Sequence, residues 1–272
     1  MKTKELNKYL LLFDAECPVC AWAAGTTAAN NILGENGKTP YQDFQSTACP
    51  VIDRQRAANE VALLDVETGQ VSYGVESMFK LLGSIAPFLN PLLSFGPFVW
   101  LMRKPYKLFA LNRRVIVPSA VSKNQIQPAL HLGYRVAYLL ITTLFAAFIL
   151  THYVQLTAGM VPVGNAYREY LICGGQIVFQ GAIISLIAKN KVWDYLGNMM
   201  TISFGGALLL MPVLILAKVF GYHPVIYTAY FMAVAGVMLF EHIRRSKLLG
   251  LGYSLTASWI LYRTAILLFI LY

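Results

Sequence analysis

Residues 9–20 read YLLLFDAECPVC, and this stretch decides the fold of the first part of the chain. Its apolar run, Tyr9–Phe13, has the length of a buried strand. The Ala-rich segment AWAAGTTAAN follows at once and predicts a helix with a stop in the Gly- and Asn-rich residues after it. Asp14, Cys17 and Cys20 are therefore predicted to lie at a strand-to-helix junction.

The two cysteines are spaced as a redox dithiol. A helix N-terminus stabilises an anion, so it should lower the pKa of the first thiol. We expect Cys17 to be the attacking thiolate and Cys20, one turn into the helix and more buried, to resolve the mixed disulfide. Asp14 is expected to accept a proton from Cys20 or to cap the helix. These three residues are the predicted catalytic set.

Two plainer interpretations of the cysteines stay open. A Cys-X-X-Cys pair is also half of a zinc site, which needs further Cys or His ligands at suitable spacing. Only Cys49 is present nearby, and the nearest histidine is His131. The pair could also be two inert core residues. The sequence predicts no metal and no cofactor.

The rest of the first part alternates in pattern. The order is strand, helix, strand, helix or loop, hairpin and helix, which indicates an α/β or α+β domain of thioredoxin size. After the first strand and helix, the predicted elements are a strand at 41–45, a loop or short helix at 53–60, a hairpin over 61–66 and 71–73, and a helix from Val75 to Gly83.

Residues 85–111 are strongly apolar but are interrupted by four prolines. Proline breaks a helix, so the segment does not predict an ordinary membrane span. One interpretation is that it packs on the core of its own domain. The other is a short helix on the membrane face, with Arg103, Lys104 and Lys107 near lipid headgroups.

The composition points to a membrane protein. The 272 residues are 57% hydrophobic and 13% charged, whereas soluble domains have about 45–50% apolar and about 25% charged residues. The net charge is +9, but the basic residues flank apolar segments and form no stripe with aromatics, which argues against nucleic-acid binding. Four cysteines are too few for a disulfide-stapled secreted domain, and no signal peptide is predicted.

From Gly133 onward, apolar stretches long enough to cross a bilayer follow one another. The sequence predicts an α/β, thioredoxin-like domain over residues 1–124 and an all-α transmembrane helix bundle of about five spans over 125–272. The predicted spans are 133–154, 168–189, 196–220, 223–243 and 253–272.

Basic residues fall on alternate sides of these spans, as the positive-inside rule requires. We expect an integral, multi-pass protein of a plasma or inner membrane, with a cytoplasmic N-terminal domain and the C-terminus outside. The residues that set this orientation are Arg113, Arg114, Lys123, Lys189, Lys191, Arg244, Arg245 and Lys247.

Several polar residues fall inside the predicted spans. Arg263 lies in mid-span and should form an ion pair, with Glu241 as a candidate partner, or bind a lipid or quinone headgroup. Gln176, Gln180 and Asn198 are expected to form hydrogen bonds between helices. Two glycine pairs, at 174–175 and 205–206, predict close helix packing. The four histidines are consistent with haem ligation or with ordinary interfacial positions.

Four segments together resemble the DCC family of thiol-disulfide oxidoreductases. They are LLFDAECPVC, YQDFQS, VALLDVETGQVSYGVESMFKLLG and the stretch from Tyr106 to Asn112-Arg113. The resemblance covers roughly residues 8–118 and implies a thioredoxin-like fold with Asp14, Cys17 and Cys20 at the motif positions. Ala15 replaces the usual glycine, and no proline precedes Val61, where a thioredoxin has its docking cis-proline.

The leading prediction is a membrane-anchored thiol-disulfide oxidoreductase. Its expected partners are the lipid bilayer and a protein thiol or disulfide substrate, without nucleic acid. The alternative is a non-enzymatic subunit of a membrane complex, with the redox-like domain as a docking module for other subunits. A third hypothesis is electron transfer through haem or quinone. The single cysteine of the bundle, Cys173, argues against a thiol relay across the membrane.

Overall fold

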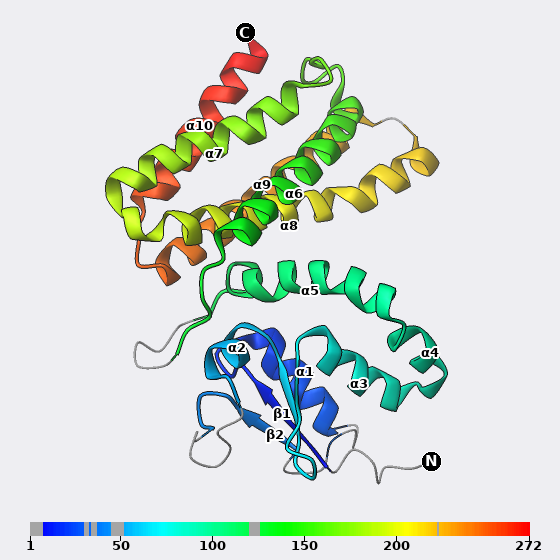
Figure 1. Cartoon of the computed structure of the whole chain (residues 1–272). Helices are drawn as coiled ribbons and strands as arrows, with labels where there is room; N and C mark the ends of the chain where they lie inside the picture. The colour runs from blue at the N-terminus through cyan, green and yellow to red at the C-terminus, as the bar shows by residue number, and fades with distance from the viewer. Residues whose placement is uncertain (1–7, 30–32, 34–36, 45–51, 120–125, 222) are drawn as a thin grey trace. The chain divides into compact units, whose positions relative to one another are not determined.

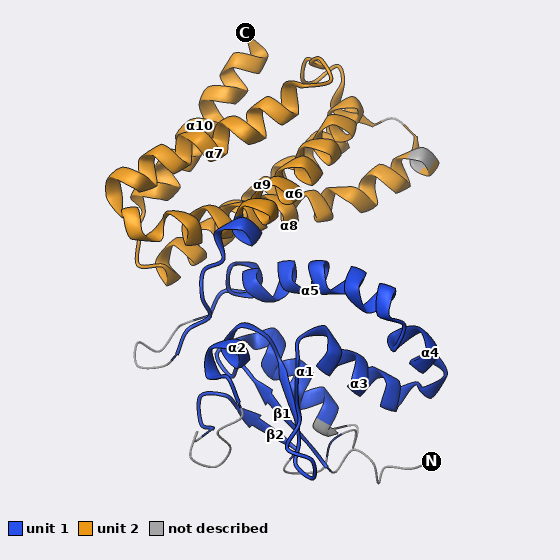
Figure 2. Cartoon of the chain, viewed as in Figure 1, with its two compact units in different colours: residues 1–135 blue, residues 136–272 orange. Residues whose placement is uncertain are grey.

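The computed structural model describes residues 8–29, 33, 37–44, 52–119, 126–221 and 223–272. The chain divides into two compact units, residues 1–135 and 136–272 (Figure 2). The first unit holds all the strands of the described part, and the second is helical (Figure 1). An α/β domain followed by helices is the predicted fold class, which is confirmed.

The N-terminal unit is built on a mixed sheet of order β2-β1-β3-β4. Strand β1 pairs in parallel with β2 and antiparallel with β3, and β3 forms a hairpin with β4. The strands are β1 (Tyr9–Phe13), β2 (Lys38–Pro40), β3 (Ala62–Asp65) and β4 (Val71–Tyr73). Strand β1 is thus an interior strand of the sheet. The residues that follow β1 therefore lie near the middle of the sheet, at the end where β1 finishes.

Successive apolar residues of β1 and β3 serve opposite faces of the sheet, because side chains alternate along a strand. Leu11 and Leu63 pair across the strands and pack with residues of α1 and α3. Leu12 and Leu64 face the other way and pack with alanines of α2. The helices are α1 (Pro18–Ala29), α2 (Arg54–Asn59) and α3 (Val75–Ile85). Burial on both faces explains why these strands are continuously apolar.

The local predictions for this unit have mixed outcomes. The hairpin is confirmed, and Gly69 takes a positive φ of 70° in its turn. The prediction of a second strand at 41–45 is wrong by three residues, because β2 ends at Pro40 and residues 41–43 form a turn. The Gln42 side chain in this turn reaches back to donate to Asp14 at 2.8 Å, so the chain leaves the sheet here.

The proline-rich segment forms η2 (Pro87–Leu89), α4 (Asn90–Leu93) and α5 (Gly96–Ile116), and α5 continues through Pro105. Helix α5 packs on its own domain: the rings of Phe98 and Phe79 stack at 5.6 Å. Trp100 and Leu101 are exposed on α5. Packing on the domain is therefore observed, while a membrane-facing side stays a prediction.

The second unit contains five helices long and apolar enough to cross a membrane among the described residues. This confirms the predicted five spans. They are α6 (Leu132–Tyr153), α7 (Arg168–Ile187), α8 (Val192–Phe220), α9 (Pro224–Leu248) and α10 (Ser254–Leu271), with short turns η3 (Val154–Thr157) and η4 (Lys189–Lys191). Helix α9 runs five residues past the predicted end.

The extension of α9 explains a wrong pairing. Glu241 was a candidate partner for Arg263, but its carboxylate binds Arg244 and Arg245 at 2.6 and 2.7 Å. These partners lie three and four residues along the same helix, where side chains meet naturally. The ion pairs keep the basic residues helical beyond the predicted span.

Each glycine pair has one member at a close contact. A Cβ on Gly175 would lie 2.7 Å from the Tyr262 hydroxyl, and one on Gly206 would lie 2.4 Å from the sulfur of Met238. Gly174 and Gly205 have nothing within 4 Å. Close helix packing is therefore confirmed for the second member of each pair and wrong for the first.

Candidate functional site

The candidate site lies where β1 ends. Asp14 follows the last residue of β1, and Tyr41 follows the last residue of the parallel strand β2. Parallel neighbours deliver their following residues to the same sheet edge. The two segments are joined there, since the N–H of Tyr41 donates to the carbonyl of Phe13 at 2.9 Å.

Cys17 occupies the N-cap position of α1. Its carbonyl accepts the first helical hydrogen bond, from the N–H of Ala21 at 2.9 Å, and Pro18 stands at the first helical position. An N-cap side chain accepts from the N–H two or three residues later. The side chain and the backbone N–H of Cys20 both lower the pKa of the Cys17 thiol.

These donors make Cys17 an acidic thiol. The hydrogen bond from the Cys20 side chain is the largest influence; burial opposes it, and the Cys20 backbone N–H and the charge of Arg113 add to it. Together they lower the pKa of Cys17 to about 6. The pKa of Cys20 is raised, first because its proton is held by Cys17 and then by burial. Both shifts favour the thiolate at Cys17 and the protonated thiol at Cys20.

The exposure of the two thiols is the reverse of the prediction. Cys17 has 1% of its surface exposed, whereas Cys20 is partly exposed, so the expectation of a more buried Cys20 is wrong. Both thiols are free of disulfide bonds in this structure.

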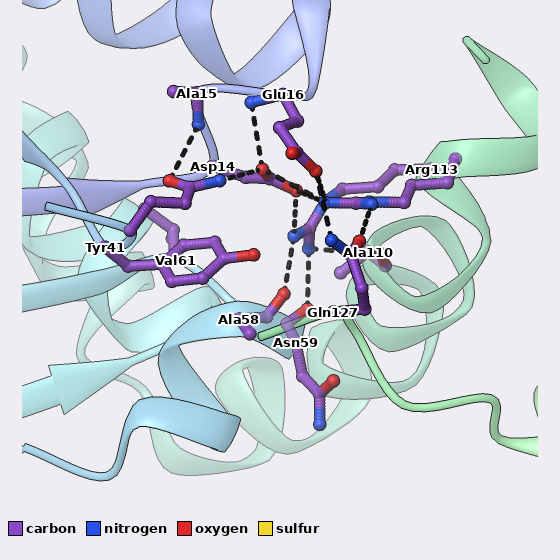
Figure 3. A network of polar contacts seen from close by, with 12 residues as sticks. Asp14, Ala15, Glu16, Tyr41, Ala58, Asn59, Val61, Ala110, Arg113 and Gln127 are labelled. Atoms are coloured by element: carbon purple, nitrogen blue, oxygen red, sulfur yellow. Dashed lines mark hydrogen bonds and ion pairs between the residues drawn. The ribbon is translucent and has the colours of Figure 1, made fainter. Parts of the chain in front are cut away.

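Asp14 is buried and surrounded by donors (Figure 3). Its Oδ2 accepts from Arg113 at 2.8 Å and from Arg114 at 3.1 Å. Its Oδ1 accepts from Gln42 at 2.8 Å and from the N–H of Glu16 at 3.1 Å. Burial alone would raise the pKa of Asp14, but the two guanidinium groups outweigh it and hold the pKa below its usual value. Asp14 is thus a fixed anion that caps the turn before α1.

Arg113 belongs to this site, although the sequence analysis did not place it there. It lies on α5 and is buried, and it donates to the carbonyls of Ala58 at 2.6 Å and Asn59 at 2.8 Å as well as to Asp14. One side chain therefore ties the end of α2 to the turn before the cysteines. The Asn112-Arg113 segment of the resemblance was the available signal, but the basic residue was interpreted only as a loop charge.

A second basic residue balances the charge on the turn. The Nη2 of Arg114 lies 3.0 Å from the carboxylate of Glu16, and the side chain of Gln127 hydrogen-bonds to Arg114. Glu16 directly precedes Cys17, where an unpaired carboxylate would oppose thiolate formation. Its negative charge is instead paired with a guanidinium.

The backbone of Val61 is hydrogen-bonded on both sides within the domain. The N–H of Val61 donates to the Tyr106 hydroxyl at 3.2 Å, and its carbonyl accepts from Gly74 at 2.8 Å. Burial, more than any other influence, raises the pKa of Tyr106 to about 12, so this hydroxyl stays neutral. No cis peptide bond occurs in the described residues.

Residues 126–129 are hydrogen-bonded to residues near this site. The Tyr41 hydroxyl donates to the carbonyl of Ile126 at 2.8 Å, and Gln55 donates to the carbonyl of Gln127 at 3.0 Å. The N–H of Ala129 donates to Asn59 at 2.8 Å. Hydrogen bonds therefore attach the chain after α5 to residues near Asp14.

A metal ion or a haem would need suitable ligands close to one another. No group of three or more His, Cys, Asp or Glu side chains comes together among the described residues. Cys49, the extra ligand that a zinc site would need, lies outside them. In the membrane unit both ring nitrogens of His242 have hydroxyl partners, Tyr195 at 3.1 Å and Thr256 at 3.0 Å.

A Cys-X-X-Cys pair at the start of the helix after an interior strand defines a thioredoxin-like redox domain, here joined to a unit of membrane-length helices. Residues 11–117 match the family model of the DCC1-like thiol-disulfide oxidoreductases. The predicted resemblance is confirmed, and the match supports an oxidoreductase. No curated protein and no solved structure matches the chain.

Proposed function

We propose that this protein is a membrane-anchored thiol-disulfide oxidoreductase that uses Cys17 and Cys20. The observation that carries the proposal is the N-cap position of Cys17, where the Cys20 donors lower its pKa to about 6. A thiol of this acidity is mostly thiolate at neutral pH, and the thiolate is the attacking species in exchange.

The proposed reaction is an exchange in two steps. The Cys17 thiolate attacks one sulfur of a substrate disulfide, forms a mixed disulfide and releases the other sulfur as a thiolate. Cys20 then loses its proton and attacks the Cys17 sulfur, which forms the Cys17–Cys20 disulfide and releases the reduced substrate. The substrate gains two electrons and the dithiol loses two; the same steps in reverse oxidise a substrate.

Asp14 acts in this proposal by positioning and not as a proton acceptor. Its oxygens are occupied by the donors of Arg113, Arg114, Gln42 and Glu16. The Asp14–Arg113 pair fixes the turn before Cys17, and the positive charge of Arg113 favours the thiolate. The proposal therefore gives Asp14 a positioning role and drops the predicted role of proton acceptor.

The proposed location is the cytoplasmic side of a plasma or inner membrane, with a domain boundary near residue 124. The connection after α7 carries Lys189 and Lys191, and the last turn of α9 carries Lys247; with five spans both lie on the side of the N-terminal domain. Lys and Arg collect in cytoplasmic loops. Arg168, on the opposite side, is paired with Glu169 at 2.7 Å. The C-terminus then lies outside.

A second function, a docking subunit of a membrane complex, is favoured by two observations. Cys17 is 1% exposed, and the backbone of Val61 is already hydrogen-bonded within the domain. A substrate would have to displace part of the covering structure before exchange. A docking module needs no such opening.

A glutathione redox titration distinguishes the two functions. The purified full-length protein is equilibrated at defined ratios of reduced to oxidised glutathione, and free thiols are then counted by mass after alkylation. We expect a single two-electron transition that links Cys17 to Cys20, and loss of this transition in Cys17→Ser. Cys173→Ser is the matched control and should titrate as the wild type does.

Failure of the dithiol to oxidise at any ratio would contradict the oxidoreductase proposal and favour the docking subunit. A transition that persists in Cys17→Ser would show that other cysteines form the disulfide.

A further inference from the structure

Helix α7 buries polar residues and exposes apolar ones, which is the reverse of a surface helix in a soluble protein. Its buried positions include Glu169, Cys173, Gln176 and Gln180, which recur at the spacing of one helix face. Gln176 is 2% exposed and Gln180 is 0% exposed, while Val178 between them is 74% exposed. In lipid the apolar side faces outward and polar groups gather inside the bundle, where they mark functional sites.

Gln180 is at the centre of a set of polar contacts from three helices. Its Oε1 accepts from the hydroxyl of Tyr195 on α8 at 2.8 Å and from that of Ser258 on α10 at 3.2 Å. Its other polar atom, Nε2, is buried and has no hydrogen-bond partner in the described part of the chain. The carbonyl end of this amide is satisfied, and its donor end is not.

Aromatic rings adjoin these contacts. The Tyr195 hydroxyl also lies 3.1 Å from Nε2 of His242. The imidazole of His242 lies against the indole of Trp259, with ring centroids 5.4 Å apart and planes inclined by 30°. The guanidinium of Arg263 lies 5.3 Å from the centre of the same indole ring. Flat surfaces and polar groups therefore occur together inside the membrane unit.

Three buried nitrogens at the α7–α10 interface lack a partner. They are Nε2 of Gln176, Nε2 of Gln180 and Nε of Arg263, and none has an acceptor among the described residues. Contacts join the two helices along this stretch: the Tyr262 hydroxyl donates to the carbonyl of Ile172 at 2.7 Å. All three orphan atoms are donors, so the groups missing from this interface are acceptors.

The depth of these donors limits what can supply the acceptors. Gln176 is the ninth of the 20 residues of α7, so it lies roughly 12 Å along the helix from its start, at about 1.5 Å per residue. That is near the middle of a hydrocarbon core about 30 Å thick. A lipid headgroup would have to leave the interface to reach it, whereas a molecule dissolved in the hydrocarbon would not.

We propose that the interface of α7 and α10 binds a quinone-class molecule: a planar ring that carries carbonyl oxygens and partitions into the bilayer. The carbonyls accept from Gln176, Gln180 and Arg263, and the ring lies against the aromatic side chains near Trp259. This proposal rests on the membrane unit alone and requires no thiol chemistry.

The test uses two probes of the same shape. Duroquinone carries two carbonyls and no free ring position for thiol addition, and durene is the same methylated ring without the carbonyls. Full-length protein in lipid nanodiscs is titrated with each probe while tryptophan fluorescence is recorded. We expect saturable quenching by duroquinone and none by durene, and a smaller quenching amplitude in Trp259→Phe.

Two variants test the donors. Gln176→Leu and Gln180→Leu keep the size of the side chain and remove the N–H groups, so each should weaken duroquinone binding by about tenfold, the equivalent of roughly 1.4 kcal/mol for one lost hydrogen bond. Val178→Leu, on the exposed side of α7, is the matched control and should bind as the wild type does. Cys17→Ser should also bind unchanged, whatever the redox titration shows.

Two results would overturn the proposal. One is equal quenching by duroquinone and durene, which would indicate simple partitioning into the lipid. The other is unchanged affinity in both glutamine variants, which would mean that the orphan donors bind only water.

Discussion

The N-terminal unit and the membrane unit differ in how completely one buried polar site in each is paired. At the sheet edge of the first unit, the buried carboxylate of Asp14 receives donors from four residues of its own domain. On α7 of the second unit, the buried amides of Gln176 and Gln180 keep unpaired donors, while Val178 faces outward.

The two sites use a buried polar group differently. In the first unit, donors from α5 and from the turns after β1 and β2 converge on the carboxylate of Asp14 and hold the backbone before Cys17 in place. In the second unit, lipid removes the reason to turn apolar residues inward, so polar groups inside the bundle are free to bind a ligand. The first network supports the proposed reactive thiol, and the second supplies the donors of the proposed ligand site.

The largest expected effect comes from breaking the network around Asp14. Asp14→Asn leaves Arg113 buried without its anion, and removing one partner of a buried pair costs about 3–5 kcal/mol. We expect the free energy of unfolding of the first unit to fall by about 3 kcal/mol, measured by native-state hydrogen exchange of the β1 amides in the full chain. The exposed Asp43→Asn is the matched control.

The same variant should lose its difference from the wild type in acid. The pKa of Asp14 is lower in the folded protein than its usual value, so its stabilisation is present above about pH 3.9, the ordinary aspartate value, and is lost as the pH falls through the folded value. A stability difference that stayed constant down to the lowest pH would contradict the ion-pair account.

The next effect tests the lipid-facing side of α7. Val178→Arg places a charge at the centre of an exposed face, where insertion of an arginine costs about 2.5–3.5 kcal/mol. We expect a loss of membrane insertion of the α7 span of this size, measured with a glycosylation reporter. Full insertion of the variant would show that Val178 faces the protein interior and not lipid.

A smaller effect concerns the acidity of Cys17. Cys20→Ala removes the thiol that donates to the Cys17 sulfur but keeps the backbone donor. Hydrogen bonds to charged groups contribute about 1.5–3 kcal/mol, so the pKa of Cys17 should rise by roughly one to two units from about 6. The pH dependence of the iodoacetamide alkylation rate measures this midpoint. An unchanged midpoint would assign the acidity to the helix N-terminus alone.

The smallest effect compares two neighbouring glycines of α7. Gly175→Ala places a Cβ 2.7 Å from the Tyr262 hydroxyl and should lower stability by about 1 kcal/mol through overpacking. Gly174→Ala meets nothing within 4 Å and should be neutral or stabilising, because alanine favours a helix. Thermal unfolding in detergent distinguishes the two, and equal effects would contradict the close approach of α7 and α10.

Local patterns predicted the parts of the fold that local forces determine. The apolar run of β1, the hairpin signal around Gly69 and the five long apolar stretches each lie within one short window of sequence. The position of the dithiol at a strand-to-helix junction followed from the same windows. The spacing of Gln176 and Gln180 on α7 was also visible, as a prediction of interhelical hydrogen bonds.

Long-range pairings were not predictable in the same way. Arg113 lies 99 residues from the carboxylate that it binds, and nothing near Asp14 in the sequence indicates which of the 22 basic residues would reach it. The burial of Cys17 depends on the surrounding fold, which the spacing of the cysteines does not fix. The contact of Gln42 with Asp14 joins residues 28 positions apart, which no local pattern indicates.

Trapping of a mixed disulfide on Cys17 in intact membranes tests the central claim most directly. In Cys20→Ser the resolving thiol is lost, so a substrate attacked by Cys17 should stay attached and be identified by mass spectrometry after non-reducing electrophoresis. We predict a discrete adduct in Cys20→Ser that is absent in the Cys17→Ser/Cys20→Ser double variant. An adduct that forms only in Cys17→Ser, or in neither single variant, would contradict the assignment of Cys17 as the attacking thiolate.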